Sequence, residues 1–168
     1  GNVSAAVTIA PDVNLDLVPG GGHSISNLIV NNGIINANVD FGGGVIDNNG
    51  TLNLASGISC GGGIINNAGL LQKNPGGNAT ISYQVNNSGT FTLSDGVIVL
   101  ENVLVNAGII QIPAGAEISG YYTTLEASSV ISGEGTLSLG GATTLNPGQT
   151  LSVETLNLNG PVNGTGLF

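Results

Sequence analysis

Two aspartates near the start of the chain are the best-placed acidic pair for chemistry. Asp12 and Asp16 flank Asn14, and on a strand these three side chains share one face. The residues that alternate with them are apolar and are predicted to point inward: Val13, Leu15 and Leu17. Carboxylates about 5–10 Å apart can hydrolyse a glycosidic bond, and oxygen ligands can hold Ca²⁺. We interpret the pattern as a solvated outer face; the calcium site and the catalytic pair stay open as alternatives.

Other catalytic chemistry lacks partners in the sequence. His23 is the only histidine and Cys60 the only cysteine, so a zinc site is short of ligands and no internal disulfide can form. A Ser-His-Asp triad could be drawn around His23, but nothing marks a nucleophile. The chain has no Arg and one Lys, Lys73, and the glycine runs 42–44 and 61–63 lack the lysine of a phosphate loop. We predict no catalytic residue, no cofactor and no metal site, and therefore a protein that is not an enzyme.

An aromatic pair offers binding chemistry instead. The segment 121–124 reads Tyr-Tyr-Thr-Thr, and aromatic rings can stack on sugars. A carbohydrate-binding face is therefore the main alternative function. A flat threonine array for ice binding is a further alternative, for which Thr51, Thr90 and Thr136 each directly follow a repeat glycine. Other copies of the repeat carry Ile or Leu there, which weakens the ice-binding hypothesis.

The composition sets the class of protein and its surroundings. Only 7% of residues are charged while 40% are hydrophobic, which indicates a packed domain and not a disordered tail. With a net charge of −9 and a single Lys, the chain cannot neutralise phosphates, so nucleic-acid binding is excluded and anionic membranes would repel it. The sequence contains no Met. We expect that a leader has been removed or that the chain is an excerpt, and both fit an extracellular or cell-surface location.

A short phrase recurs along the chain. It consists of a β-branched residue, a short Asn-rich stretch of two or three residues, and a glycine, and it ends at Gly33, Gly50, Gly69, Gly89 and Gly108. The steps between these glycines are 17, 19, 20 and 19 residues. Degenerate copies ending at Gly135 and Gly166 follow after 27 and 31 residues, which we interpret as inserted loops or an extra face.

After each glycine, apolar and polar residues alternate, which is typical of a strand with one buried face. The apolar members predicted to point inward are Ile35, Leu52, Leu54, Phe91, Leu93, Ile110, Ile112, Leu137 and Leu139. Lys73 breaks the pattern after Leu71, and no partner for a buried Lys is obvious. We therefore predict that this strand ends early, before the turn at 74–77.

A unit of about 19 residues cannot bury its own apolar face, whereas stacked copies can. The sequence therefore predicts an all-β parallel β-helix (β-solenoid) of about eight rungs, roughly 40 Å long. We assign it to one domain, 1–168, with regular repeats at 28–112 and looser rungs at 113–168. A β-sandwich with Asn-Gly hairpins is the rival fold, but hairpin loops have no reason to recur in register.

The repeated glycines and asparagines are predicted to form the structural corners. A sharp corner favours positive φ, which Gly adopts without strain, and stacked Asn side chains can hydrogen-bond along the axis. The residues assigned to these corners are Gly33, Gly50, Gly69, Gly89, Gly108, Asn32, Asn49, Asn67 and Asn87. An asparagine array that binds a ligand is the functional alternative.

Two segments resemble known repeats. Residues 65–100, IINNAGLLQKNPGGNATISYQVNNSGTFTLSDGVIVL, resemble repeats of large bacterial surface proteins, including a Lys near the strand end, matched by Lys73, and a Thr-Ile segment, matched by Thr80-Ile81. Residues 144–158 resemble the β-helices of autotransporter passengers and filamentous-haemagglutinin-like adhesins. The likeness covers roughly residues 28–160 and lies in the repeat pattern. It implies a right-handed β-helix on an exported adhesin, stalk or filament, and it carries over no catalytic residue.

The two ends of the chain suggest a partner. Val7 and Ile9 share one face of a first strand, whereas Leu167 and Phe168 begin a rung that the sequence does not finish. Open strand edges invite pairing, so we expect head-to-tail stacking of identical chains into a fibre. The alternative is that neighbouring rungs of a longer chain cover these edges.

Overall fold

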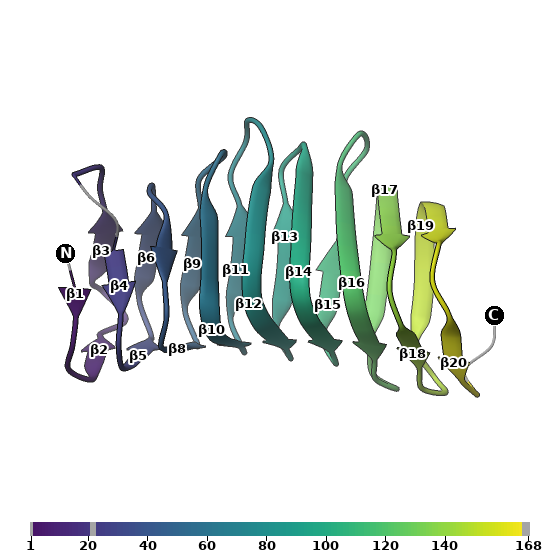
Figure 1. Ribbon diagram of the computed structural model, residues 1–168, viewed down its shortest axis with the longest axis horizontal. Helices are drawn as coiled ribbons and strands as arrows, with labels where there is room; N and C mark the ends of the chain where they lie inside the picture. The colour runs from purple at the N-terminus through teal and green to yellow at the C-terminus, as the bar shows by residue number, and fades with distance from the viewer. Residues whose placement is uncertain (1, 21–22, 166–168) are drawn as a thin grey trace.

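The protein is built from short parallel strands. The computed structural model describes residues 2–20 and 23–165, and within these ranges it contains twenty strands and no helix. Every strand pairing is parallel, and each strand pairs with its equivalent one turn earlier or later. Figure 1 shows the resulting stack, from β1 in purple to β20 in yellow. The predicted β-solenoid is therefore confirmed, and the rival hairpin-connected sandwich is excluded.

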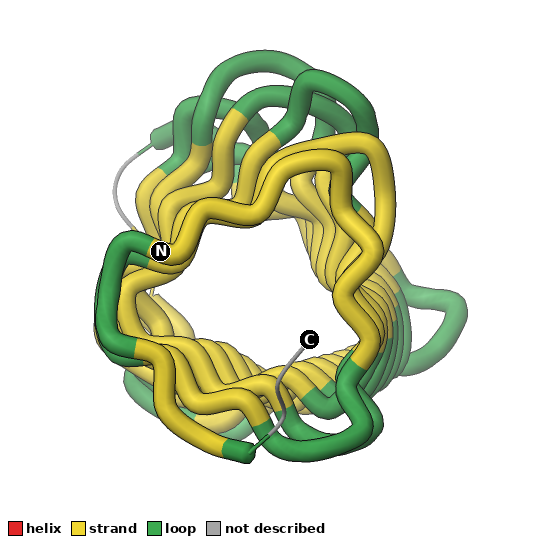
Figure 2. Tube along the Cα trace, turned by 90° about the vertical axis from the view of Figure 1, so that its right-hand side faces the viewer, coloured by secondary structure: helices red, strands yellow, loops and turns green. Residues whose placement is uncertain are grey.

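Each turn of the chain crosses three faces, which form the walls of the tube in Figure 2. The first face holds β1 (Asn2–Val3), β4 (His23–Ile25) and β7 (Phe41–Gly42), the first halves of β10 (Ser59–Asn67), β12 (Ala79–Asn87), β14 (Val97–Asn106) and β16 (Glu117–Leu125), and the second halves of β17 (Val130–Leu139) and β19 (Thr150–Leu158). The second face holds β2 (Val7–Ile9), β5 (Leu28–Asn31), β8 (Val45–Asn48), the second halves of β10, β12, β14 and β16, and then β18 (Thr143–Leu145) and β20 (Val162–Gly164). The third face holds β3 (Asn14–Leu17), β6 (Ile34–Ala37), β9 (Thr51–Leu54), β11 (Leu70–Lys73), β13 (Thr90–Leu93), β15 (Ile109–Gln111) and the first halves of β17 and β19.

The stack contains about eight turns, here called rungs, and their length stays nearly constant. Asn31, Asn48, Asn67, Asn87 and Asn106 occupy equivalent positions, separated by 17, 19, 20 and 19 residues. The register continues through Leu125, Leu145 and Gly164, at steps of 19, 20 and 19. The longer steps expected near the end are therefore wrong. Gly135 lies at a different corner, against Pro113 and Ala116, and Gly166 falls outside the described residues.

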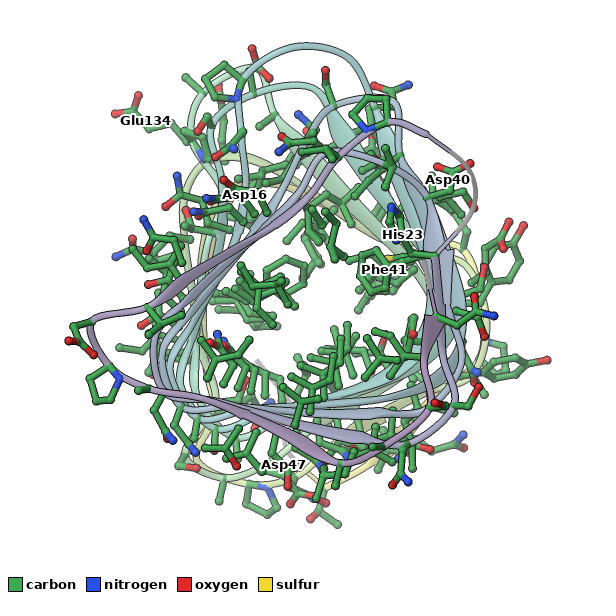
Figure 3. The ribbon with its side chains drawn as sticks, turned by 90° about the vertical axis from the view of Figure 1, so that its left-hand side faces the viewer. Asp16, His23, Asp40, Phe41, Asp47 and Glu134 are labelled. Carbon is green, nitrogen blue, oxygen red and sulfur yellow. The ribbon has the colours of Figure 1, made fainter. Side chains whose placement is uncertain are left out.

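The core is a set of inward-pointing apolar columns. All nine residues predicted to point inward are buried, with Leu52, Leu54 and Phe91 at 0% exposure. Phe41 points into this interior in Figure 3, whereas Asp47 and Glu134 lie on the outer surface. One inward prediction is wrong: Val13 is 45% exposed because it belongs to the corner that precedes β3.

The repeated glycines stack on one another, but for a different reason from the one expected. Positive φ is wrong for Gly33, Gly50, Gly69, Gly89 and Gly108, because none of them adopts it. Instead, a Cβ on Gly89 would lie 2.2 Å from the carbonyl oxygen of Gly69, and one on Gly69 would lie 2.1 Å from that of Gly50. Such distances are far inside van der Waals contact. Glycine is required here because successive corners approach too closely for a side chain.

Lys73 also departs from expectation. The strand does not end early: β11 includes Lys73, whose side chain points into the core at 0% exposure between Leu54 and Leu93. Its ammonium donates to the carbonyl oxygens of Asn74 (3.0 Å), Gly76 (2.7 Å) and Asp95 (2.9 Å), and it lies 3.2 Å from the Asp95 carboxylate. These four acceptors compensate for burial of the charge. Lys73 therefore links the corners of two successive rungs, at the point where the chain passes from the third face to the first.

The glycine runs 42–44 and 61–63 make room for an aromatic side chain. The ring of Tyr83 is buried and packs 5.8 Å, centroid to centroid, from that of Phe41. Its hydroxyl donates to the carbonyl oxygen of Gly43 at 2.5 Å, two rungs away. A Cβ on Gly63 would lie 2.6 Å from the Tyr83 ring. Gly63 therefore serves packing, whereas Gly43, Gly44 and Gly62 of the same runs adopt positive φ.

Candidate functional site

A buried ladder of five asparagines runs along the second face. Each side-chain amide donates to the next one: Asn31 to Asn48 at 2.6 Å, Asn48 to Asn67 at 2.6 Å, Asn67 to Asn87 at 2.7 Å and Asn87 to Asn106 at 2.6 Å. The same amides donate to a backbone carbonyl of the next rung, as Asn48 does to Leu70 at 2.9 Å. All five side chains are at most 2% exposed, so this ladder is internal and has no surface to offer a ligand.

The asparagines assigned to the corners fall into two groups. Asn67 and Asn87 belong to the buried ladder, together with three residues that were not singled out, Asn31, Asn48 and Asn106. Asn32 and Asn49 lie one residue further along, at the outer edge of the corner, where Asn49 donates to Asn32 at 3.1 Å. The offset from the glycine could have separated the two groups, because each buried asparagine lies two residues before its glycine, whereas Asn32 and Asn49 lie one residue before theirs.

A second ladder lies on the outside of the same face and floors a groove. Asn66 donates to Asp47 and Asn86 donates to Asn66, both at 2.8 Å. The groove has a volume of about 400 Å³ and runs along the axis from Val30 to Val105. This groove was not predicted from the sequence.

The acidic pair near the start of the chain lies on the outer surface. Asp16 projects from β3 and accepts a hydrogen bond from Asn36 at 2.7 Å, and Asn53 donates to Asn36 at 2.8 Å. Asp16 thus begins a third side-chain ladder, on the third face, while Asp12 lies in the corner before β3. No group of three His, Cys, Asp or Glu side chains suited to a metal occurs among the residues that the structure describes.

The residues considered for nucleophilic chemistry lie in one column of the first face, where His23 and Cys60 pair with Phe41 from opposite sides. His23 Nε2 lies 3.1 Å from the carbonyl oxygen of Val18. Cys60 is buried beneath the first face, where desolvation, followed by the charge of Asp40, raises the pKa of its thiol to about 12. A thiol that stays protonated at neutral pH is a poor nucleophile. Cys60 therefore acts as a small core residue.

The aromatic pair is exposed, but its threonine neighbours differ. Tyr121 and Tyr122 of β16 are 53% and 55% exposed. Thr123 is buried, and its hydroxyl has no hydrogen-bond partner, so it cannot form part of an outer platform. The threonines of the ice-binding alternative do not share one column either, because Thr136 pairs with Glu117 on the first face while Thr51 and Thr90 flank Leu70 on the third.

The residues expected at the assembly edges are only partly described. Val7 and Ile9 lie on β2, paired with Ile29 and Asn31; Val7 is 37% exposed and Ile9 is buried. Leu167 and Phe168 fall outside the described residues. At the other end, Leu156 and Leu158 of β19 are partly buried against the core and Val162 is exposed.

Comparison with known proteins assigns the chain to no family. No family model matches the chain, and searches of the curated proteins and of the solved structures found no significant match. Within the described ranges there is no helix long and apolar enough to cross a membrane. The structure supports the β-helix part of the resemblance to bacterial surface repeats, and the rest of that resemblance enters the proposal below.

Proposed function

We propose that the chain is a structural or adhesive β-solenoid of an exported surface protein or an extracellular filament. The observation that carries the proposal is the set of three hydrogen-bonded side-chain ladders that follow the axis in addition to the backbone pairing. Each ladder joins one rung to the next, so bending or separating the rungs breaks side-chain and backbone bonds together. A stack held in this way is suited to bear load or to hold other groups away from a surface.

The composition supports an extracellular location. The chain has a single Lys and no Arg, and that Lys is fully buried, so trypsin-like proteases find no accessible cleavage site in the folded stack. Uncharged Asn, Ser, Thr and Gly make up most of the polar surface.

The location can be tested with antibodies raised against the folded chain and used for immunogold labelling of the source cells. We expect label on the cell surface or on extracellular fibres of intact cells. Label confined to the cytoplasm of permeabilised cells would overturn the proposal.

The partner in this proposal is a further β-rung, supplied by a second copy or by a longer chain. Val7 supports the interface because its inward-facing side chain is 37% exposed, with no rung of the described stack beyond β2 to cover it. Light scattering across a concentration series should show growth of assemblies by the isolated chain, and Val7→Lys should suppress it. Val18→Lys, at a corner residue that is 54% exposed, is the matched control. A parent chain that stays monomeric at high concentration would eliminate the self-assembly part.

A further inference from the structure

The groove on the second face is opened by a change of residue type at its rim. The rim position directly precedes the stacked glycine, and it holds Asn49 in the third rung but Ala68, Ser88 and Ala107 in the next three. Shortening the rim side chain exposes the outer ladder over successive rungs. The result is a trough parallel to the axis, suited to an elongated ligand.

The floor of the groove offers repeated hydrogen-bonding groups. Each primary amide has two N–H donors and a carbonyl oxygen with two lone pairs. In Asn66 and Asn86 the ladder uses one donor each, toward Asp47 and Asn66, and Gln84 donates to the Asn86 oxygen at 3.0 Å. The remaining N–H groups and lone pairs belong to half-buried side chains that line the groove. Donors and acceptors that alternate in this way match hydroxyl groups, which both donate and accept.

The spacing of the floor constrains the ligand further. Equivalent positions on successive rungs are about 4.8 Å apart, which is close to the rise per sugar of an extended β-linked hexose chain. Neighbouring sugars in such a chain face opposite ways, so every second sugar can make the same contacts at every second rung. An extended peptide advances about 3.3 Å per residue and would fall out of step within a few rungs.

Charge decides which glycans can bind. Asp47 contributes a carboxylate to the floor, the chain carries a net charge of −9, and its one Lys is buried on the third face. Uronic acids, sulfated sugars and phosphates would meet like charge without a cation to offset it. The groove therefore favours a neutral glycan.

An aromatic ring lies on the same face, next to the end of the groove. Tyr122 pairs with Val103, two residues before Val105 on the neighbouring strand, and is 55% exposed. Aromatic rings stack on the apolar faces of sugars. We propose that the groove from Val30 to Val105, extended by Tyr122, binds a neutral, extended, β-linked glycan chain. This inference deepens the adhesive part of the proposed function and rests on that part alone.

The test is isothermal titration of the purified chain with cello-oligosaccharides of two to six sugars. Affinity should rise with each sugar up to four or five and then level off, because the groove spans five rungs. Maltohexaose, which is curved, and oligogalacturonate, which is acidic, should bind at least about tenfold more weakly. Failure of every cello-oligosaccharide to bind at millimolar concentration would overturn the inference, while surface labelling tests the proposed extracellular location separately.

Variants distinguish the groove from the aromatic pair alone. Ala68→Phe fills the groove at an exposed position and should weaken cellohexaose binding at least about tenfold, whereas Ala114→Phe, at an exposed alanine of another corner, should not. Tyr122→Ala should weaken binding about fivefold. Unchanged melting temperatures would show that all three variants fold. Binding that survives Ala68→Phe but is lost in Tyr122→Ala would place the ligand on the tyrosines and refute the groove.

Discussion

The second to sixth rungs and the two rungs that follow have nearly the same length but differ at the corner between the second and third faces. In the earlier rungs an inward Asn and a stacked Gly form a tight corner, as at Asn67 and Gly69. In the later rungs Leu125 and Leu145 occupy the ladder position, and four-residue corners follow, 126–129 and 146–149. The spacing of about 19 residues persists through this change. Rung length and the apolar columns therefore define the solenoid, whereas the asparagine ladder is one of two ways to close a corner.

Hydrogen bonding explains why asparagine precedes the tight corners and leucine precedes the four-residue corners. A tight corner leaves backbone carbonyls that the ladder amides satisfy, such as those of Leu70 and Thr90. A four-residue corner satisfies part of its own backbone, since the Ser129 N–H donates to the carbonyl of Glu126 at 2.9 Å. The Ser129 hydroxyl also accepts from Asn106, which ends the ladder. Leucine can then replace asparagine without leaving buried polar groups unpaired.

The largest effect is expected from placing leucine, the residue found in the later rungs, at an asparagine-ladder position of the earlier rungs. Asn67→Leu removes the acceptor for Asn48 and the donor to Asn87 and to the Thr90 carbonyl. Two or three buried polar groups would lose partners, so the free energy of unfolding should fall by about 4 kcal/mol. Urea denaturation measures this loss. Leu125→Met, a volume-conserving change in the equivalent column, is the control and should cost under about 1.5 kcal/mol. Equal losses for the two variants would mean that the amides are dispensable and the two kinds of corner equivalent.

The second prediction separates two demands for glycine. Gly89 has an ordinary φ but no room for a Cβ, whereas Gly115 has a φ of +74° and no atom within 4 Å of a Cβ. Gly89→Ala should cost about 3 kcal/mol through overpacking of the stacked corners, and Gly115→Ala about 1 kcal/mol through backbone strain. Thermal denaturation of both variants checks the order. A larger loss for Gly115→Ala would contradict the steric explanation of the glycine column.

Sequence patterns could predict the core because alternation fixes which way a strand residue points once its neighbours are known. Leu52, Leu54 and Phe91 follow from this rule alone. The glycine column shows the limit of this rule. A glycine in the sequence, as at position 89, can be required by crowding from another rung or by positive φ, and the sequence does not distinguish the two causes. The phrase ending at Gly135 likewise resembles the repeat, although it forms a different corner.

Contacts between rungs were the least predictable part of the candidate site. The carboxylate beside Lys73 comes from Asp95, 22 residues away, and nothing near Lys73 in the sequence indicates that two loops converge there. The groove is similar, because Ala68, Ser88 and Ala107 look like neutral variation within a repeat until the rungs are stacked. Both features depend on register along the axis, which the sequence gives only approximately.

The third prediction concerns Lys73, which lies in the regular part of the stack. Lys73→Met keeps an apolar stem between Leu54 and Leu93 but removes the donor to three backbone carbonyls. Water can reach some of these corner groups, so we expect a loss of about 2 kcal/mol. Hydrogen exchange should rise at 74–78 and 94–96 and stay unchanged at the corner 126–129. A uniform rise along the chain would show that Lys73 supports the whole core instead of two loops.

The smallest effect is a pH dependence at the same contact. The Gly76 N–H, at 2.9 and 3.1 Å, and then the Lys73 ammonium hold the pKa of Asp95 below its ordinary value of 3.8. A carboxylate whose pKa is lowered by folding stabilises the native state above the unfolded value, and this contribution is lost as the pH falls through the folded value. The difference in unfolding free energy between the parent chain and Asp95→Asn should therefore be constant near neutral pH and shrink below about pH 4. Asp95 is half-exposed, so the effect is small and is best seen in urea midpoints for both proteins between pH 7 and pH 2. A difference that grows on acidification would have the wrong sign and would mean that the Asp95 carboxylate does not stabilise the corner.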